Sequence, residues 1–185
     1  MLKLLKLKLR NKVELKGKNT IILGENIRVR YCDISLRGNN NKLILSDGVN
    51  LKRVCIEITG SNCLIYIGKH CIIGENTYLS SRGSSTHLSI GNYCMFSRNV
   101  KLMTSDGHDI TKNNKIINPN ASITIGHRVW LADSCVILKG NDIQDNAIIG
   151  INAVVTKNVK ANSIVAGNPA KMIGQDITWR EELTE

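Results

Sequence analysis

One histidine lies where it could act as a general base. His108 stands in the segment TSDGHDI, between Asp106 and Asp109. An imidazole titrates near neutral pH, so it is suited to take a proton from an alcohol. A carboxylate or carbonyl on its second ring nitrogen would fix the tautomer that accepts the proton. Taken alone, a histidine in an exposed loop is more often a solvated side chain, so its role depends on what surrounds it.

The chain that surrounds this segment repeats with a period of six. From Ile125 onward an aliphatic or small residue recurs at every sixth position, and the fourth residue after each tends also to be small or apolar. The series contains Ile125, Leu131, Ile137, Ile143, Ile149, Val155, Ala161, Gly167 and Ile173. The same spacing appears earlier, and the glycines Gly17, Gly38, Gly60 and Gly83 add a longer cycle of about 22 residues.

A period of six predicts short strands joined by turns. An α-helix repeats every 3.6 residues and a continuous strand every two, so neither fits. Three short strands make a triangular coil, and stacked coils pair their strands in parallel around a column of small aliphatic side chains. The repeat is interrupted from about residue 106 to 121, which predicts a loop that protrudes from the coils and carries His108.

Composition agrees with one domain that has a narrow core. The chain has 185 residues, 4% aromatics, two prolines and a net charge of +10. The charge favours acidic partners, although nothing resembling a nucleic-acid motif accompanies it. Four of the six cysteines, Cys55, Cys71, Cys94 and Cys135, follow an aliphatic residue by four positions, and there is no CxxC pair. We therefore expect free, buried thiols and a cytoplasmic protein, without a transmembrane segment.

The two ends of the chain depart from the repeat. The start, MLKLLKLKLR, alternates leucine with basic residues and predicts a first strand that caps the fold, with contact to a membrane surface as the alternative. Near the other end, Thr178 followed by Glu181 is typical of a capping box and predicts a short helix through Leu183.

Four stretches together resemble a known family. In order they are TSDGHDI, ITIGHRVWLA, IIGINAVVTKNV and AGNPAKMI, and they are similar to the hexapeptide-repeat acetyltransferases of polysaccharides and sugars, including the maltose and galactoside acetyltransferase group. The capping box predicts a helical tail over residues 177–185. For residues 1–176 the resemblance implies an all-β, left-handed parallel β-helix of hexapeptide repeats. It also implies a homotrimer with acetyl-CoA sites between subunits.

The resemblance further implies roles for individual residues. His108 would be the general base on a sugar hydroxyl, which attacks the thioester of acetyl-CoA directly in a ternary complex. Asp106, Asp109 and Trp130 would orient the base or line the acceptor site. The residues implied for acetyl-CoA binding are Ala132, Asp133, Gly150, Ile151, Thr156, Lys157, Pro169, Ala170 and Lys171. Ala132 and Ile151 depart from the smaller residues usual in the family, which leaves the size of the acyl group open.

Other functions are possible on the same fold. An N-acetyltransferase on an amino sugar or nucleotide sugar would use a similar solenoid and histidine. A zinc hydratase would need three converging histidines, but His70, His87, His108 and His127 include no closely spaced pair, so no metal site is expected. A non-enzymatic binding β-helix would show a regular array of threonines, whereas the outward positions here are mixed.

Overall fold

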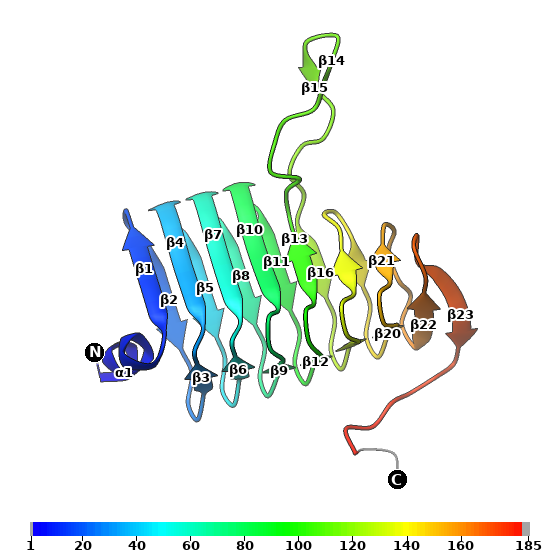
Figure 1. The fold of residues 1–185 in the computed structure, drawn as a ribbon, viewed down its shortest axis with the longest axis horizontal. Helices are drawn as coiled ribbons and strands as arrows, with labels where there is room; N and C mark the ends of the chain where they lie inside the picture. The colour runs from blue at the N-terminus through cyan, green and yellow to red at the C-terminus, as the bar shows by residue number, and fades with distance from the viewer. Residues whose placement is uncertain (1, 183–185) are drawn as a thin grey trace.

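The computed structural model describes residues 2–182 as a three-sided parallel β-solenoid with a short helix at its N-terminal end (Figure 1). This confirms the predicted architecture of stacked triangular coils. No helix among the described residues is long and apolar enough to cross a membrane. The helix, α1, spans Leu2–Arg10.

Each side of the solenoid is one sheet, and neighbouring coils contribute neighbouring strands. Sheet A contains β1 (Lys12–Lys16), β4 (Asp33–Asn39), β7 (Cys55–Ser61), β10 (Tyr78–Ser84), β13 (Lys101–Met103), β18 (Val136–Ile137) and β21 (Val154–Val155). Sheet B contains β2 (Thr20–Leu23), β5 (Lys42–Leu45), β8 (Leu64–Ile67), β11 (His87–Ile90), β16 (Ile123–Ile125) and β19 (Asp142–Ile143). Sheet C contains β3 (Arg28–Arg30), β6 (Asn50–Lys52), β9 (Ile72–Ile73), β12 (Met95–Phe96), β17 (Trp130–Leu131), β20 (Ile148–Ile149), β22 (Ser163–Ala166) and β23 (Lys171–Gln175). Within the sheets all pairs are parallel except β22 with β23, which close the C-terminal edge as an antiparallel pair.

The core is the predicted column of aliphatic side chains, with one change of register. Leu131 pairs with Ile149, 18 residues later, but Ile149 pairs with Val165, only 16 residues later. The predicted series therefore holds through Val155 and is wrong beyond it. Ala161, Gly167 and Ile173 are exposed, and Val159 and Val165 fill the core in their place.

The cysteine side chains lie in or beside the same column of core residues. All six cysteines are free, and five of them are buried. Cys55 is only half-buried, because the adjacent Val54 occupies the core position instead. Burial raises the pKa of the Cys135 thiol to about 12, so this group behaves as a small apolar side chain.

The N-terminal segment is a helix, so the prediction of a capping strand was wrong. The alternation is broken by the pair Leu4–Leu5, and the segment contains no β-branched residue, while leucine, lysine and arginine are good helix formers. A helix brings Leu4 and Leu7 onto one side, where both pack on the core of the first coil. It caps the solenoid as the strand was expected to do.

The predicted C-terminal helix is also wrong for the residues that can be judged. From Thr178 to Glu182 the chain forms no helix, and Leu183 lies outside the described residues. The indole of Trp179 is buried and donates a hydrogen bond to the carbonyl of Arg128 at 2.6 Å. This side-chain contact holds the tail against the solenoid in place of a helical turn.

The corner between sheets A and B depends on stacked glycines. Gly38, Gly60 and Gly83 have positive φ angles of 107°, 125° and 118°. A Cβ atom on Gly60 would lie 1.8 Å from the carbonyl oxygen of Gly83, and one on Gly38 would lie 1.9 Å from that of Gly60. The long glycine cycle in the sequence therefore marks the positions where one coil approaches the next too closely for any side chain.

This close approach predicts a large effect of a single methyl group. Gly60→Ala should lower the free energy of unfolding by about 2–4 kcal/mol, because the new Cβ meets backbone that cannot move aside. Gly107→Ala is the matched control, since its φ is 88° but no atom lies within 4 Å of its Cβ. It should cost only about 1 kcal/mol, from the backbone conformation alone. Urea unfolding followed by far-UV circular dichroism measures both losses, and equal losses would show that the contact between coils is not the cause.

Candidate active site

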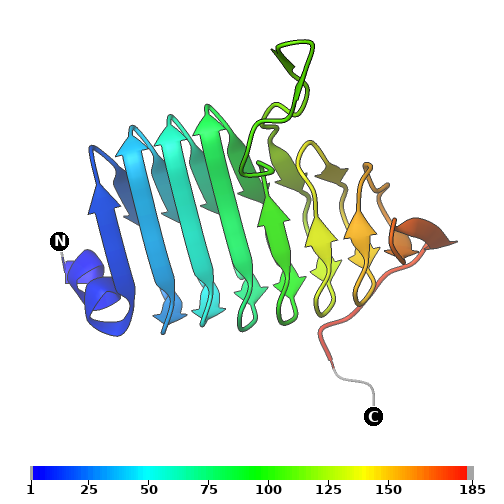
Figure 2. The ribbon, with the colours of Figure 1, turned by 45° about the horizontal axis from the view of Figure 1, so that its top comes forward.

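The loop with His108 leaves the solenoid at the corner between sheets A and B (Figure 2). Its base is closed by a hydrogen bond from the amide of Ala121 to the carbonyl of Thr104 at 3.0 Å. Its tip is a small hairpin of β14 (Thr111–Lys112) and β15 (Lys115–Ile116). The loop predicted over 106–121 is thus present as a defined projection that places His108 in solvent.

A clamp formed by Asp106, Asn118 and Lys139 fixes the base of this loop. The ammonium of Lys139 donates to Asp106 Oδ2 at 2.5 Å and to the carbonyl of Asn118 at 2.8 Å. The amide of Asn118 donates to Asp106 Oδ2 and to the carbonyl of His108, both at 2.9 Å. Hydrogen bonds from Lys139 and then Asn118 lower the pKa of Asp106. The clamp holds the backbone of His108 directly.

Asp106 therefore positions the loop and does not contact the imidazole. Both of its hydrogen-bond donors belong to the clamp. Asp109 is exposed, and the contacts among the described residues give neither His108 nor Asp109 a side-chain hydrogen bond. Within one chain the imidazole of His108 is therefore exposed, without a protein partner among the described residues.

Trp130 lies on the outer side of sheet C, against the C-terminal tail. Its ring is tilted 44° to that of Trp179, with centroids 6.1 Å apart, and its N–H donates a long hydrogen bond of 3.4 Å to Ser97 Oγ. Arg128 lies over Trp179, 5.7 Å from the ring centroid, and donates to the carbonyl of that residue at 3.1 Å. The tail thus covers part of the tryptophan that the sequence predicts near the acyl group.

The predicted acetyl-CoA residues fall into three groups. Ala132, Asp133, Gly150 and Ile151 precede β18 and β21, at the corner between sheets C and A, whereas Thr156 and Lys157 follow β21 at the corner that carries the loop. The turn with Pro169, Ala170 and Lys171 lies beside β21, since Val154 donates to Gly167 and accepts from Ala170.

These positions leave His108 apart from the first group. The loop follows β13, whereas Ala132 and Gly150 precede β18 and β21 in the same parallel sheet, so they lie at opposite edges of sheet A. A single chain does not bring the predicted base and this group together.

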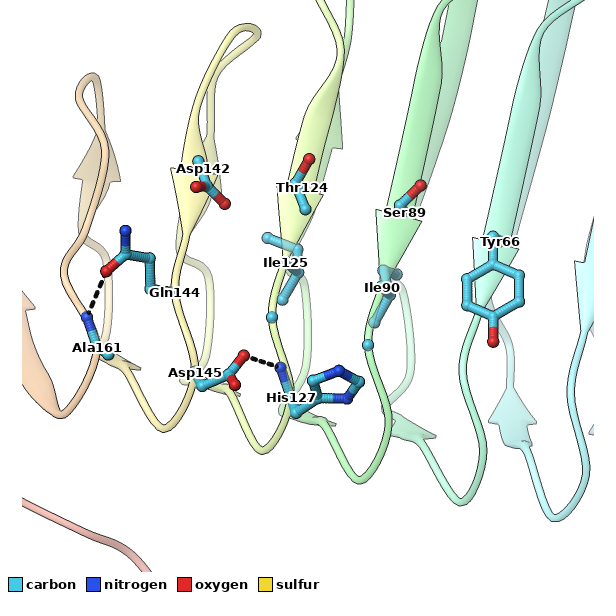
Figure 3. A pocket seen from close by; sticks show the side chains of 12 residues that line it. Tyr66, Ser89, Ile90, Thr124, Ile125, His127, Asp142, Gln144, Asp145 and Ala161 are labelled. Carbon is cyan, nitrogen blue, oxygen red and sulfur yellow. Dashed lines mark hydrogen bonds between the residues drawn. The ribbon is translucent and has the colours of Figure 1, made fainter.

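The chain also has a shallow hollow on the outer side of sheet B, where sequence reasoning expects no site (Figure 3). It measures about 580 Å³, and its floor is the aligned outward side chains of Tyr66, Ser89, Thr124 and Asp142. At its edge Asp145 accepts a hydrogen bond from the amide of His127 at 2.7 Å. None of the predicted site residues lines this hollow.

Across the described residues, no group of three or more His, Cys, Asp or Glu side chains is placed to hold a metal ion. His70 and His127 lie at the corner between sheets B and C in different coils, whereas His87 lies on β11 and His108 on the protruding loop. His70 is stacked on Tyr93 with ring centroids 5.3 Å apart, and His127 accepts a hydrogen bond from the amide of Asn92 at 2.9 Å.

Sequence reasoning missed Asn118, Lys139, Arg128 and Trp179. Lys139 could have been found from the repeat, because Leu102 pairs with Ile137 and residue 139 must then lie at the corner where the loop departs. For Trp179 the signal was its rarity, as the chain has only two tryptophans.

The clamp makes a prediction about loop opening. Lys139→Met removes the cation, so the loop should open more often and trypsin should cleave several-fold faster after Lys112 and Lys115. Lys157→Met, one coil further along the same corner, is the control and should leave cleavage unchanged.

The lowered pKa of Asp106 determines how opening of the loop should depend on pH. The pair with Lys139 is fully present above the pKa of an unpaired carboxyl and is lost only as pH falls through the lowered value. Amide exchange at Ile110, which donates to Asn118 Oδ1, should therefore stay slow until that range is reached. Fast exchange at neutral pH would contradict the clamp.

Comparison with known proteins identifies what this fold is similar to. No family model matches the chain. A polysialic acid O-acetyltransferase of Escherichia coli O1:K1 / APEC is 34% identical over 118 residues, covering 60% of this chain and 38% of that protein. The chain spans less than two thirds of the length of the curated polysialic acid O-acetyltransferases that it matches.

Two crystal structures match almost the whole chain. The polysialic acid O-acetyltransferase OatWY superposes with a TM-score of 0.86 at 26% identity, over 94% of this chain and 88% of that one. The polySia-specific acetyltransferase NeuO superposes with a TM-score of 0.74 at 30% identity, over 94% of this chain and 90% of that one. This chain therefore belongs to the hexapeptide-repeat β-helix family of sugar O-acetyltransferases.

Proposed function

We propose that the chain is an acetyl-CoA-dependent O-acetyltransferase that acts on a sugar hydroxyl of a surface polysaccharide or its precursor. The observation that carries this proposal is the agreement with the polysialic acid O-acetyltransferase structure over 94% of the chain. The protruding loop adds a free imidazole on a backbone that the clamp holds in place.

His108 is the general base in this proposal. Its unprotonated ring nitrogen takes the proton of the acceptor hydroxyl while the oxygen attacks the thioester carbonyl of acetyl-CoA. The tetrahedral intermediate then collapses, the carbon–sulfur bond breaks, and the imidazolium returns its proton to the departing thiolate of CoA. The acetyl group moves directly to the sugar, so no acyl-enzyme forms.

The donor lies along the corner between sheets C and A. Small side chains follow one another there in successive coils, at Ser97, Ala132, Gly150 and Ala166. Such a strip lets a pantetheine arm lie close to the backbone, and backbone N–H groups nearby can meet the oxyanion. Lys171, exposed in the turn beside β21, supplies a point charge for the CoA phosphates. Lys157 is exposed at the other end of β21, at the corner that carries the loop, so it reaches only a cofactor that extends across this strand. Asp133 is held by Arg98 Nε at 2.9 Å and shapes this corner.

The site is completed by a second copy of the chain in a homotrimer. His108 and the strip of small residues lie at opposite edges of sheet A in one chain, so a neighbour must bring its loop to the strip. Closed rings of three solve this geometry with three equal sites. Trp130 of one subunit then faces His108 of the next.

The acceptor is an acidic glycan in this proposal. The net charge of +10 raises the local concentration of a polyanion and speeds its encounter with the enzyme. Two polysialic acid O-acetyltransferase structures superpose over 94% of this chain, which makes polysialic acid the first acceptor to test.

Loss of the base should remove most of the activity. His108→Ala should lower acceptor-dependent release of CoA thiol by roughly 10²-fold or more, as expected for the loss of a general base. His87→Ala, a matched change of an exposed histidine on β11, should leave the rate within about twofold of wild type. Equal rates for wild type and His108→Ala would show that another group is the base.

Shared sites predict complementation between inactive subunits. When His108→Ala and Trp130→Ala chains are unfolded together in equal amounts and refolded, about one quarter of the sites join two intact partners, so about one quarter of the wild-type activity should return. The same protocol on each variant alone is the control. No recovery from hybrid trimers, verified by mass, would mean that each chain builds its own site.

A further inference from the structure

The N-terminal end of the solenoid combines exposed leucines with arginines that have no acidic partner among the described residues. We propose that this end is a docking surface for an anionic phospholipid membrane. The surface, called here the N-terminal basic face, consists of Leu5, Leu9, Arg10, Arg28, Arg30 and Tyr31. Its function is separate from acetyl transfer and does not depend on the mechanism proposed above.

Contacts with the first coil of the solenoid fix the orientation of α1. Leu4 and Leu7 pack on the core, and the buried amide of Asn11 donates to the carbonyls of Leu7 at 2.8 Å and Val29 at 3.1 Å. The amide of Tyr31 donates to the carbonyl of Arg10 at 3.0 Å. The helix therefore lies across the end of the first coil with one defined side outward (Figures 1 and 2).

That outward side carries apolar groups. Leu5 and Leu9 are one turn apart, so they form a single ridge, and they are 55% and 78% exposed. Lys6 and Lys8 are exposed on the same helix, whose first turn has no acidic residue. A leucine ridge beside lysines is the pattern of helices that lie in the plane of a membrane interface.

Beside the ridge is a concavity with three arginines. It measures about 630 Å³ and is lined by Leu9, Arg10, Arg28, Arg30 and Tyr31. Arg28 and Arg30 both point outward from β3, because Val29 between them is buried. Neighbouring cations are neutralised, as Lys3 pairs with Glu25 and Lys12 with Asp33, but the ion pairs of the described residues include none of these three arginines.

The chemistry favours a phospholipid over a soluble polyanion. Guanidinium groups bind phosphate through paired hydrogen bonds, and the concavity is wide enough for a lipid headgroup. A soluble acidic glycan would use the arginines but would leave Leu5 and Leu9 in water. A bilayer buries both leucines and places Tyr31, 70% exposed, at the headgroup level. Apolar burial and basic charge together are what peripheral membrane binding requires.

Vesicle flotation of the full chain tests the proposal. The protein should float with vesicles of phosphatidylcholine and phosphatidylglycerol in equal parts, and should stay at the bottom of the gradient with phosphatidylcholine alone. Arg10→Gln/Arg28→Gln/Arg30→Gln should weaken binding by about 100-fold, since each cation near an anionic leaflet contributes about fivefold. Leu5→Ser/Leu9→Ser should weaken it by at least about tenfold.

A variant that lacks three exposed lysines elsewhere on the molecule is the control for the effect of net charge alone. Lys112→Gln/Lys115→Gln/Lys160→Gln lowers the net charge equally and should bind the vesicles as wild type does. Unchanged thermal unfolding of the leucine variant would show that α1 remains docked, because Leu4 and Leu7 are kept.

Three outcomes would overturn the proposal. They are no flotation of the wild type, equal binding by all variants, and binding to soluble polysialic acid that depends on the arginines while vesicle binding does not. The last result would assign the N-terminal basic face to a glycan. Thiol release with a soluble acceptor should be the same in wild type and in the leucine variant, so a failure here is distinct from a failure of the proposed enzyme.

Discussion

Everything in this molecule depends on the hydrogen bonds between one coil and the next. A parallel ladder joins each strand to the strand of the following coil, so a residue at one position of a coil lies over the residue at the same position of its neighbour. The position of a residue in the sequence therefore determines which corner or face of the solenoid it occupies, and in which coil. The close approach of Gly60 and Gly83 and the column of buried aliphatic side chains are both results of this one constraint.

The same constraint decides what the sequence could predict. A residue type that every coil requires at the same position leaves a period, which is why the three-sided solenoid and the recurrence of the glycines were predictable. The frequent asparagines are explained as well, since turn residues such as Asn26, Asn62 and Asn146 have positive φ angles that asparagine tolerates. The shorter last coil was missed because Ala161 and Gly167 continue the pattern by residue type while their side chains lie in solvent.

The structures of the two ends were predicted wrongly because they depend on tertiary contacts and not on the six-residue period. After the methionine, the first ten residues are five leucines and four basic residues, a composition that allows a strand or a helix. The packing of Leu4 and Leu7 on the first coil selects the helix. The tail contains a capping signal, but burial of Trp179 on Arg128 and Trp130 outweighs one helical turn. Tertiary contacts, which no local pattern records, decided both cases.

For the candidate site, the sequence predicted the residue types and the structure supplies their relation. His108 stands on a loop where the period breaks, and that much is readable from residues alone. That Asp106 serves Lys139 and not the imidazole depends on which coil passes beneath the loop. The separation of His108 from Ala132 and Gly150 across sheet A likewise needs the topology, and it is the main argument for a site shared between copies.

The solenoid also sets the distance between its N-terminal end and the protruding loop. Four steps of the ladder, through β1, β4, β7, β10 and β13, separate the coil beneath α1 from the coil that carries the loop. With neighbouring strands about 4.8 Å apart, the loop leaves the axis about 20 Å from the capped end. Duplication or deletion of a whole coil in this half would preserve every kind of contact, yet it would change this height in fixed increments. The number of N-terminal coils is therefore a dimension that evolution can adjust without redesigning either end.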